Sequence, residues 1–537
     1  MISNNIVLIP KLGQVTGIYD LVCKTTQYLG IPYGSVSRRW TRATALREFP
    51  GGQHDGSQYG PICPQLGGVG SPSLTQLAVP GFPPNPVLVQ DEFACLNLNI
   101  LKPDTEIAGL PVMVWIHGGG LAVGSNSELV YTGKELVRRS MKAGMPVIHV
   151  AINYRLGPFG FLSSKQLLEE NGGKAVGNYG LWDQRLALQF VSDHISAFGG
   201  DPNRVTIFGE SAGGASVHAH TVSAEALFSQ AICQSGVVRS IGPLPPSDPY
   251  MDGFYNSFSA QLGQTSPASP EILRKIPARD LVNAAVYLAG GNLPIGIITD
   301  DSALPEGFFP PTTDFVTPSS WLQRFMIGDC AVEGVIVAPN MLHIPTSEMV
   351  TFLSGPDAPP KSHLAKFGLA DLDTATVDKL NPPLIHRLVG LLTELAFFGP
   401  SEEVIAASPP ASTYVYRFDR PNGWGPGPFG EVAHHTIDLL YIAGVPKTHP
   451  TSNAQKDSEV SEKMIGQWID FVVGKEPWEA TGNEGVQLLF GEDGSMKEVG
   501  REMVRSRDFE NVGGVTGENA WIALRTNIAF CTGVIRS

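Results

Sequence analysis

The chain has 537 residues, of which 37 are Lys or Arg and 51 are Asp or Glu, so its formal net charge at neutral pH is −14. A chain this acidic is not expected to bind nucleic acid or anionic lipid. Hydrophobic residues make up 42% and charged residues 16%, which excludes a disordered protein and indicates a globular one with a large core.

The sequence contains no run of 18 apolar residues, which predicts no membrane-spanning helix. The N-terminus lacks a basic stretch, and its apolar run from Ile6 to Ile9 is too short for a signal peptide. No N-x-Ser/Thr glycosylation acceptor occurs, so we expect a cytoplasmic location, or secretion if the N-terminus given is a processed one. The six cysteines lack the spacing of a metal site, and no metal or cofactor is expected.

Alternating apolar and amphipathic stretches predict an α/β fold. The almost continuously apolar strands indicate a mostly parallel sheet that helices cover on both faces. Predicted strands cover 110–116, 146–154, 204–208, 325–328 and 413–418, and predicted helices cover 133–143, 179–198, 461–473 and a segment that begins at Ala212. In helix 179–198 the residues Leu181, Leu188, Val191, Ile195 and Phe198 share one face, which predicts that this face packs on the core. Because no linker separates two halves, we expect a single domain over 1–537, with pocket-forming insertions at 248–314 and 347–408.

A strand that ends in a small-residue turn and enters a helix carries the first chemical motif. Residues 205–208 run into Gly209-Glu210-Ser211-Ala212-Gly213, which is the G-x-S-x-G pattern of a nucleophile elbow. The strained turn exposes the serine hydroxyl above the sheet, at a helix N-terminus that favours a nearby oxyanion. Ser211 is therefore the candidate nucleophile.

A second motif supplies candidate donors for an oxyanion hole. The strand 110–116 ends in His117-Gly118-Gly119-Gly120, whose residues without side chains let backbone amides approach a reacting oxygen. In known cases one such donor stabilises the transition state by about 3–4 kcal/mol. We assign the amides of Gly119, Gly120 and Ala212 to this role.

A serine nucleophile needs an imidazole base that a carboxylate orients, and in this fold they follow in the order Ser, acid, His. Strand 325–328 runs into a loop that carries Asp329 and Glu333, and a later loop carries His434 and His435. Spacing alone does not choose within either pair, although Glu333 and His435 are the first choices.

In its motifs the chain resembles the type-B carboxylesterase/lipase family of α/β-hydrolases, which includes cholinesterases and fungal lipases. The matching segments are GIPYG (30–34), DEFACLNLNI, VWIHGGG, INYRLGPFGFL, GNYGLWDQRLAL, FGGDPNRVTIFGESAGGAS and AICQSG, all in the family's order. The family's acid lies between a strand and a glycine, as Glu333 does before Gly334, and its histidine precedes an acid by three residues, as His435 precedes Asp438. The resemblance therefore favours Glu333 and His435 over their neighbours.

The resemblance also implies supporting residues. Glu210 is expected as a second carboxylate near the histidine, and Ser235 as a support for the triad acid. Cys63 and Cys95 match a disulfide that closes a surface flap, 63–95, in relatives, although in a reducing cytosol the pair would stay as thiols. We expect the other four cysteines to be buried and free, with reactivity of Cys330 near the site as a lesser alternative.

The predicted activity is hydrolysis of a largely apolar carboxylic ester through an acyl-enzyme. The same triad also serves acyl transfer, lactone opening or another biosynthetic step, and these remain alternatives. A non-catalytic binding protein on the same fold is a more remote one. The expected partner is a small-molecule ester, and the sequence pattern indicates no oligomeric state.

Overall fold

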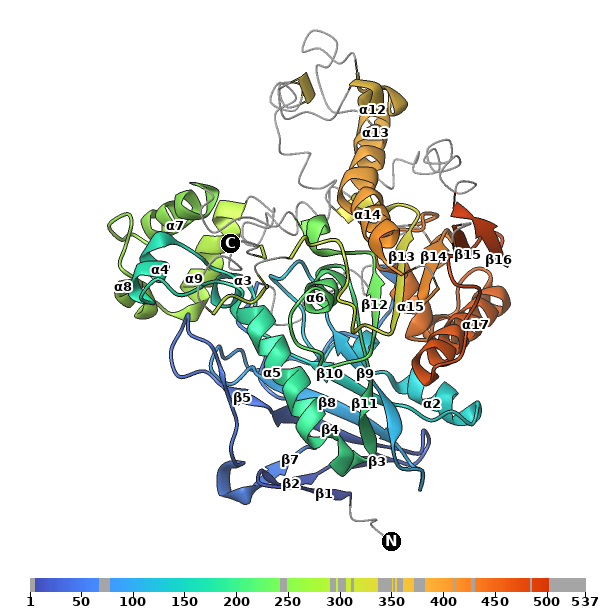
Figure 1. Ribbon diagram of the computed structural model, residues 1–537, viewed down its shortest axis with the longest axis horizontal. Helices are drawn as coiled ribbons and strands as arrows, with labels where there is room; N and C mark the ends of the chain where they lie inside the picture. The colour runs from blue at the N-terminus through green and yellow to red at the C-terminus, as the bar shows by residue number, and fades with distance from the viewer. Residues whose placement is uncertain are drawn as a thin grey trace.

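An eleven-stranded sheet runs through the centre of the molecule (Figure 1). The computed structural model describes residues 5–66, 78–241, 249–289, 296–297, 306–310, 313–336, 350, 353–354, 361–370, 382–409, 411–425, 430–482 and 485–501. The strand order is β16-β15-β14-β13-β12-β11-β9-β10-β8-β4-β3. Their bounds are β3 (Ile18–Asp20), β4 (Thr25–Pro32), β8 (Asn97–Pro103), β9 (Leu110–Ile116), β10 (Ile148–Ile152), β11 (Gly200–Glu210), β12 (Gln230–Gln234), β13 (Arg324–Cys330), β14 (Thr413–Phe418), β15 (Val486–Phe490) and β16 (Met496–Gly500).

The inner strands from β10 through β15 pair in parallel, and the strands at both ends pair antiparallel. The predicted, mostly parallel α/β sheet is therefore confirmed.

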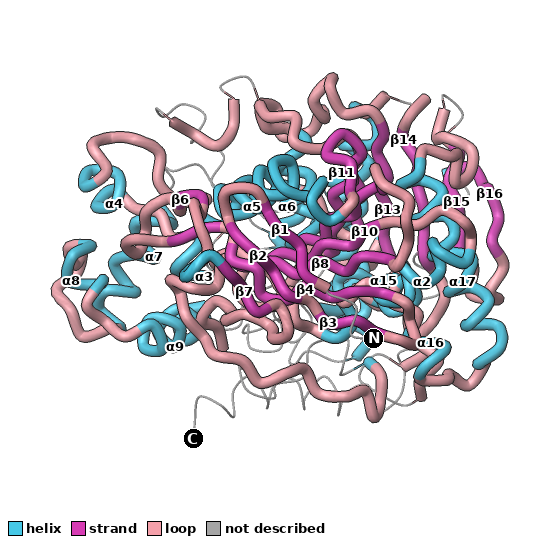
Figure 2. The backbone as a smooth tube through the Cα atoms, turned by 90° about the horizontal axis from the view of Figure 1, so that it is seen from below, coloured by secondary structure: helices cyan, strands magenta, loops and turns pink. Residues whose placement is uncertain are grey.

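Two small sheets lie outside it. One comprises β1 (Ile6–Ile9), β2 (Gly13–Thr16) and β7 (Gln53–Asp55), which lie together in Figure 2. The other pairs β5 (Gly34–Ser35) with β6 (Thr44–Ala45).

Helices flank the sheet and extend beyond it. They are α2 (Lys134–Lys142), α3 (Gly157–Gly160), α4 (Lys165–Glu170), α5 (Tyr179–His194), α6 (Ala212–Thr221), α7 (Pro249–Gln261), α8 (Pro270–Arg274), α9 (Ala278–Ala289), α12 (Lys361–Lys366), α13 (Pro382–Thr393), α14 (Gly399–Ala407), α15 (Ile437–Ile442), α16 (Val445–Thr448) and α17 (Ala454–Val473). Short 3-10 turns cover Pro50–Gly52, Leu129–Tyr131, Ile195–Phe198, Val238–Ile241 and Glu333–Ile336, and a π-helical turn covers Glu394–Phe398.

The sheet separates two large hydrophobic core clusters, because successive side chains of a strand point to opposite faces. Along β9, Val114 and Ile116 belong to one cluster, which α5 and α6 cover. Met113 and Trp115 belong to the other, which α2, α15 and α17 cover. The core face predicted for 179–198 is confirmed, because all five of its residues are buried in the first cluster. The predicted helix is shorter than expected, however: α5 carries Leu181, Leu188 and Val191, and the 3-10 turn that follows it carries Ile195 and Phe198.

A buried ion pair ties the loop after β10 to α5. Nε and Nη2 of Arg155 lie 2.7 and 2.8 Å from the two carboxylate oxygens of Asp183, and the Arg155 amide donates to the same carboxylate at 3.1 Å. Arg155 also donates to the carbonyl of Thr41 at 2.8 Å. The two side chains are 1% and 0% exposed, so each charge depends on the other.

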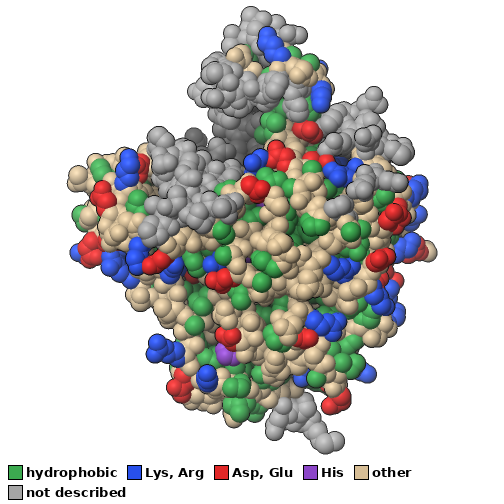
Figure 3. All heavy atoms as spheres, viewed as in Figure 1, with side chains coloured by type: hydrophobic (Ala, Val, Ile, Leu, Met, Phe, Trp, Pro, Cys, Tyr) green, Lys and Arg blue, Asp and Glu red, His purple; other side chains and the backbone are tan. Residues whose placement is uncertain are grey.

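The expected insertions are described in part. Helices α7, α8 and α9 come from the first, and α12, α13 and α14 from the second, where α12 and α13 project from the body (Figure 1). Residues 67–77 of the expected flap lie outside the described residues. Charged side chains of both signs are scattered over the face seen in Figure 3. None of the helices in the described ranges combines the length and apolar character needed to cross a membrane.

Candidate active site

Ser211 lies at the sharp turn between β11 and α6. Its backbone has φ 59° and ψ −126°, a conformation that a residue with a side chain adopts only under strain. The turn requires small neighbours: a Cβ on Gly209 would lie 2.6 Å from the backbone of Gly213, and one on Gly213 would lie 2.1 Å from the carbonyl oxygen of Ile116. The elbow geometry predicted for this segment is therefore present.

The glycine loop after β9 lies directly against this turn. A Cβ on Gly118 would lie 2.6 Å from the Glu210 carbonyl oxygen. Gly119 has φ 95° and Gly120 has φ 62°, and the Gly119 carbonyl accepts bonds from the amides of Ala122 and Val123 at 3.1 and 3.0 Å. The carbonyl of Gly119 thus closes the turn of the glycine loop. Ala212 is the first residue of α6, and the backbone amides of a first helical turn have no acceptor within the helix.

His435 and Glu333 form a buried pair. Nδ1 of His435 contacts Oε2 of Glu333, and the two side chains are 1% and 0% exposed. The other carboxylate oxygen of Glu333 accepts the Cys330 amide at 2.5 Å. The loops that carry them are joined by a bond from the Val332 amide to the Ala433 carbonyl, at 2.9 Å. Glu333 thus holds the imidazole at Nδ1.

The alternative acid and base occupy separate environments. Asp329 accepts a bond from the Ser401 hydroxyl at 3.2 Å, and burial together with Glu333 raises its pKa to about 7. In His434, Nδ1 lies 2.6 Å from the His435 carbonyl and Nε2 lies 3.3 Å from the Asn422 amide nitrogen. The structure therefore brings Glu333 and His435 into contact with each other. Asp329 instead bonds to Ser401, and His434 lies against Asn422.

Glu210 supplies a second carboxylate to the imidazole. Its Oε1 lies 3.0 Å from Nε2 of His435, although neither atom is aligned for a hydrogen bond with another described residue. Burial raises the pKa of Glu210 to about 8. Burial by itself lowers the pKa of His435, but the carboxylates of Glu210 and Glu333 outweigh it and raise that pKa to about 9. The titration of His435 therefore depends on that of Glu210.

The carboxylesterase family model matches residues 3–507. The chain belongs to the carboxylesterase family. It is 28% identical to Lipase 3 of Yarrowia lipolytica over 91% of this chain and 94% of that protein. It is 31% identical to the para-nitrobenzyl esterase of Bacillus subtilis over 85% of this chain and 89% of that protein. A solved structure of a PNB esterase matches with a TM-score of 0.70 and 27% identity, over 94% of this chain and 100% of that one.

These relatives confirm the family and the α/β-hydrolase fold inferred from the motifs. This carboxylesterase-family chain is a serine ester hydrolase of the carboxylic-ester class, and its relatives do not favour the alternatives of acyl transfer, lactone opening or a non-catalytic binding protein. Within the described residues, no group of three His, Cys, Asp or Glu side chains could hold a metal ion.

Ser235, expected to support the acid, contacts the strand that leads to Glu333. Its hydroxyl donates to Sγ of Cys330 at 3.9 Å, and its amide donates to the Gly328 carbonyl at 2.8 Å. The Cys330 amide in turn holds Glu333. Burial raises the pKa of the Cys330 thiol well above its usual value, which argues against a reactive thiol here.

Two expectations about cysteines need correction. Cys63 and Cys95 are both buried free thiols, not a disulfide. Sγ of Cys63 accepts the Leu156 amide at 3.2 Å, and a hydrogen bond with Cys63 raises the pKa of the Cys95 thiol. The two thiols therefore lie within hydrogen-bond distance of each other. Cys23, expected to be buried, is only partly buried because it follows an exposed turn after β3.

Two side chains near the histidine, Phe397 and Asp438, have contacts that the sequence did not predict. Phe397, in the π-helical turn, has its ring 5.1 Å from that of His435. Its insertion carries no motif, so the sequence held no signal for it. Asp438 is fully buried and accepts bonds from the Tyr416 hydroxyl at 2.7 Å and the Gln234 amide at 3.0 Å. The family pattern gives the spacing of Asp438 from His435. Its hydrogen-bond partners, however, depend on the order of the strands in the sheet.

Proposed function

We propose that Ser211, His435 and Glu333 hydrolyse a largely apolar carboxylic ester through an acyl-enzyme. The observation that supports this assignment is the strained Ser211 at the start of α6, directly after Glu210. The Glu210 carboxylate lies 3.0 Å from Nε2 of the buried His435, and Glu333 contacts Nδ1 of the same imidazole. Burial of that pair in a low-dielectric setting strengthens its electrostatic interaction and fixes the tautomer with Nε2 free.

In the first half-reaction, the Ser211 hydroxyl oxygen attacks the ester carbonyl carbon and its proton passes to Nε2 of His435. The carbonyl oxygen gains the negative charge and is stabilised by the amides of Gly119, Gly120 and Ala212. Collapse of this intermediate breaks the bond to the alcohol oxygen, which leaves with the proton from Nε2. Ser211 is then acylated.

In the second half-reaction, water attacks the acyl carbon while His435 accepts one of its protons. The new tetrahedral intermediate expels the Ser211 oxygen, which recovers the proton from Nε2, and the carboxylic acid leaves. Glu333 keeps the imidazole oriented and stabilises its charged form throughout. Glu210, on the Nε2 side, favours the same charged form.

An apolar substrate is supported by the ring of Phe397 against His435 and by the glycine loop, which brings no charged side chain to the nucleophile. We therefore infer a small ester with an apolar acyl or alcohol part. A cytoplasmic location stays a prediction from the sequence.

The test is hydrolysis of p-nitrophenyl esters of increasing acyl length by the wild type and by Ser211→Ala. We expect the variant to lose turnover by a factor of about 10⁴ or more while its thermal unfolding temperature is unchanged. Full activity in a folded Ser211→Ala protein would overturn the assignment. An optimum at long acyl chains would support an apolar acyl site, and a preference for charged acyl groups would contradict it.

A further inference from the structure

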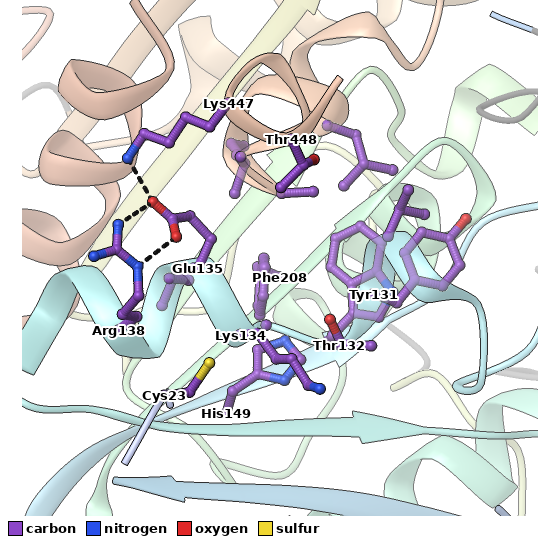
Figure 4. Close-up of a pocket in the computed structure, with 18 residues that line it drawn as sticks. Cys23, Tyr131, Thr132, Lys134, Glu135, Arg138, His149, Phe208, Lys447 and Thr448 are labelled. Atoms are coloured by element: carbon purple, nitrogen blue, oxygen red, sulfur yellow. Dashed lines mark hydrogen bonds and ion pairs between the residues drawn. The ribbon is translucent and has the colours of Figure 1, made fainter. Parts of the chain in front are cut away.

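The segment that joins β9 to α2 begins with the glycine loop of the candidate active site. At its other end, residues 130–134 line a cavity of about 250 Å³ beside α2, where Figure 4 shows Tyr131, Thr132 and Lys134. None of residues 117–124 lines that cavity. The contacts that hold the glycine loop come from other parts of the chain, which bind its backbone at three positions.

Two of these positions are held by the segment that follows β10. The Tyr154 hydroxyl donates to the carbonyl of His117 at 2.8 Å, and the Gly157 amide donates to the carbonyl of Leu121 at 2.7 Å. Tyr154 is buried, and its ring stacks on that of His117 with the centroids 4.5 Å apart. The start and the middle of the loop are thus fixed to the core of the fold.

The third position is Gly124, at the end of the loop, and a side chain of the flap 63–95 holds it. Oε1 of Gln65 accepts the Gly124 amide at 2.7 Å, and Nε2 of Gln65 donates to the Gly124 carbonyl at 3.0 Å. Nε2 also donates to the Cys63 carbonyl at 3.1 Å. Because both carbonyls can only accept, these bonds fix the orientation of the side-chain amide. One glutamine therefore binds both backbone groups of one glycine.

Gln65 is itself anchored at the base of the flap. Its backbone amide donates to Oε1 of Gln90 at 3.1 Å, and Ile62 forms a parallel β-bridge with Gln90. The Ile62 amide donates to the Val89 carbonyl, and the Ile62 carbonyl accepts the Asp91 amide, both at 2.9 Å. The two limbs of the flap therefore fix the position from which this side chain reaches the glycine loop.

Gly124 packs against the residues that lead into the oxyanion loop. A Cβ on Gly124 would lie 2.5 Å from Nδ1 of His117 and 2.9 Å from the Gly118 carbonyl oxygen. The Val123 carbonyl lies as close to Gly119, where a Cβ would be 2.2 Å from it. Val123 is 39% exposed, and backbone at an exposed position opens readily unless a bond closes it. A displacement of Gly124 would therefore displace Gly119, whose amide is an assigned oxyanion donor.

We propose that Gln65 is a positioning residue for the oxyanion hole, because it fixes Gly124 through both of its backbone groups. This inference rests on the proposed function, in which the amides of Gly119 and Gly120 stabilise the oxyanion. Gln65 acts on the reaction through the backbone of the loop, and keeps these amides directed at the point where negative charge develops. At such a site, a misplacement of about 1 Å can lower the rate about a hundredfold.

Two substitutions of Gln65 separate its bonds to Gly124. Methionine has a similar length and bonds to neither backbone group, whereas glutamate keeps an acceptor for the Gly124 amide but has no N–H for the carbonyl. With p-nitrophenyl butyrate as the substrate, we expect Gln65→Met to lower kcat by about 10- to 100-fold with less than about a twofold change in KM. Gln65→Glu should recover part of this loss.

Gln264→Met is the matched control. Like Gln65, Gln264 is a partly buried glutamine whose Nε2 donates to the carbonyl two residues before it, here that of Leu262 at 3.1 Å. It lies in the turn between α7 and α8. Gln264→Met should leave kcat and KM unchanged, and thermal unfolding of all three variants establishes that each is folded.

Hydrogen exchange tests the contact itself without reference to activity. In the wild type the Gly124 amide is bonded to Gln65. A peptide that covers 117–124 should therefore exchange one amide hydrogen faster in Gln65→Met, and at the wild-type rate in Gln264→Met. Gln65→Glu should keep most of the protection, because its carboxylate still accepts this amide.

The inference is overturned if Gln65→Met keeps the wild-type kcat, if only KM changes, or if Gln65→Glu loses as much kcat as Gln65→Met. It is also overturned if Gln65→Met leaves exchange at Gly124 unchanged. Should Gln65→Met not fold, Gln65→Glu decides: a partial loss of kcat supports the inference, and the wild-type kcat overturns it.

Ser211→Ala separates these failures from a failure of the proposed function. An active Ser211→Ala protein contradicts the catalytic assignment. An inactive Ser211→Ala protein beside a fully active Gln65→Met protein contradicts only the role of Gln65.

Discussion

Oε1 of Glu210 lies 3.0 Å from Nε2 of His435, the ring nitrogen that Glu333 does not hold. The imidazole is thus placed between two carboxylates, one at each nitrogen. This arrangement stabilises the imidazolium that forms when Ser211 is deprotonated, and it also makes the resting imidazole harder to keep neutral.

The first prediction concerns pH. His435 must be neutral to accept a proton, and the Glu210 charge raises its pKa, so activity should be lost as pH falls through that raised pKa. Glu210→Gln removes the charge and should shift the acid limb of the kcat/KM profile to lower pH. Glu271→Gln, an exposed carboxylate on α8, is the control and should leave the profile unchanged. A shift toward higher pH would contradict the electrostatic role of Glu210.

The second prediction concerns the glycine loop. A Cβ on Gly119 would lie 2.2 Å from the Val123 carbonyl oxygen, so Gly119→Ala should displace the loop. We expect kcat to fall by about 10²–10³ with a small change in KM, as for loss of an oxyanion donor. Gly172→Ala shares a positive φ but meets no neighbour, so it should cost at most about 1–2 kcal/mol of stability and no activity. Steady-state kinetics and thermal unfolding of both variants test this, and equal kcat values would refute it.

The third prediction concerns stability. Asp183→Asn leaves the buried guanidinium of Arg155 without its counter-charge and should lower the free energy of unfolding by about 3–5 kcal/mol. The exposed pair of Arg38 with Glu170 is the comparison, and Arg38→Ala should cost no more than about 1 kcal/mol. Denaturant unfolding measures both, and similar costs for the two variants would show that burial does not set the strength of the Arg155 pair.

The fourth prediction concerns Phe397, whose ring packs against that of His435. Phe397→Ala removes this contact and should lower kcat by up to about a hundredfold, because a small displacement of the base misaligns proton transfer. Phe397→Leu should recover part of the loss. Phe398→Ala, whose ring faces Arg417 instead, is the control. If Phe398→Ala lowers kcat as much as Phe397→Ala does, the effect belongs to the helix and not to the contact.

The parts of the fold that sequence patterns predicted are those with local causes. The predicted strands 110–116 and 413–418 match β9 and β14 residue for residue, because the first is continuously apolar and the second is rich in aromatic and β-branched residues. The elbow at Ser211 and the loop at Gly119 follow from glycine requirements that lie within a few residues. Glu333 and His435 were predicted from the family motifs, and the structure brings their side chains into contact.

The remaining parts depend on contacts between distant segments. The partners of Asp438, Gln234 on β12 and Tyr416 on β14, come from elements whose order in the sheet the sequence does not state. The approach of Phe397 to His435 depends on a π-helical turn inside an insertion without a motif. The cavity beside α2 likewise forms only when β9, α2 and α16 are assembled.

The bond from Val332 to Ala433 joins the acid loop to the histidine loop, which lie about one hundred residues apart in the chain. During synthesis from the N-terminus, the nucleophile elbow and the glycine loop therefore exist well before the base is made. A fragment that ends ahead of β14 would hold Ser211 and the amides proposed for the oxyanion hole, yet lack His435, the proposed base. A growing chain can therefore become catalytically competent only after His435 has been added. For the same reason, a chain cut between β14 and α15 should show turnover only when both pieces are mixed.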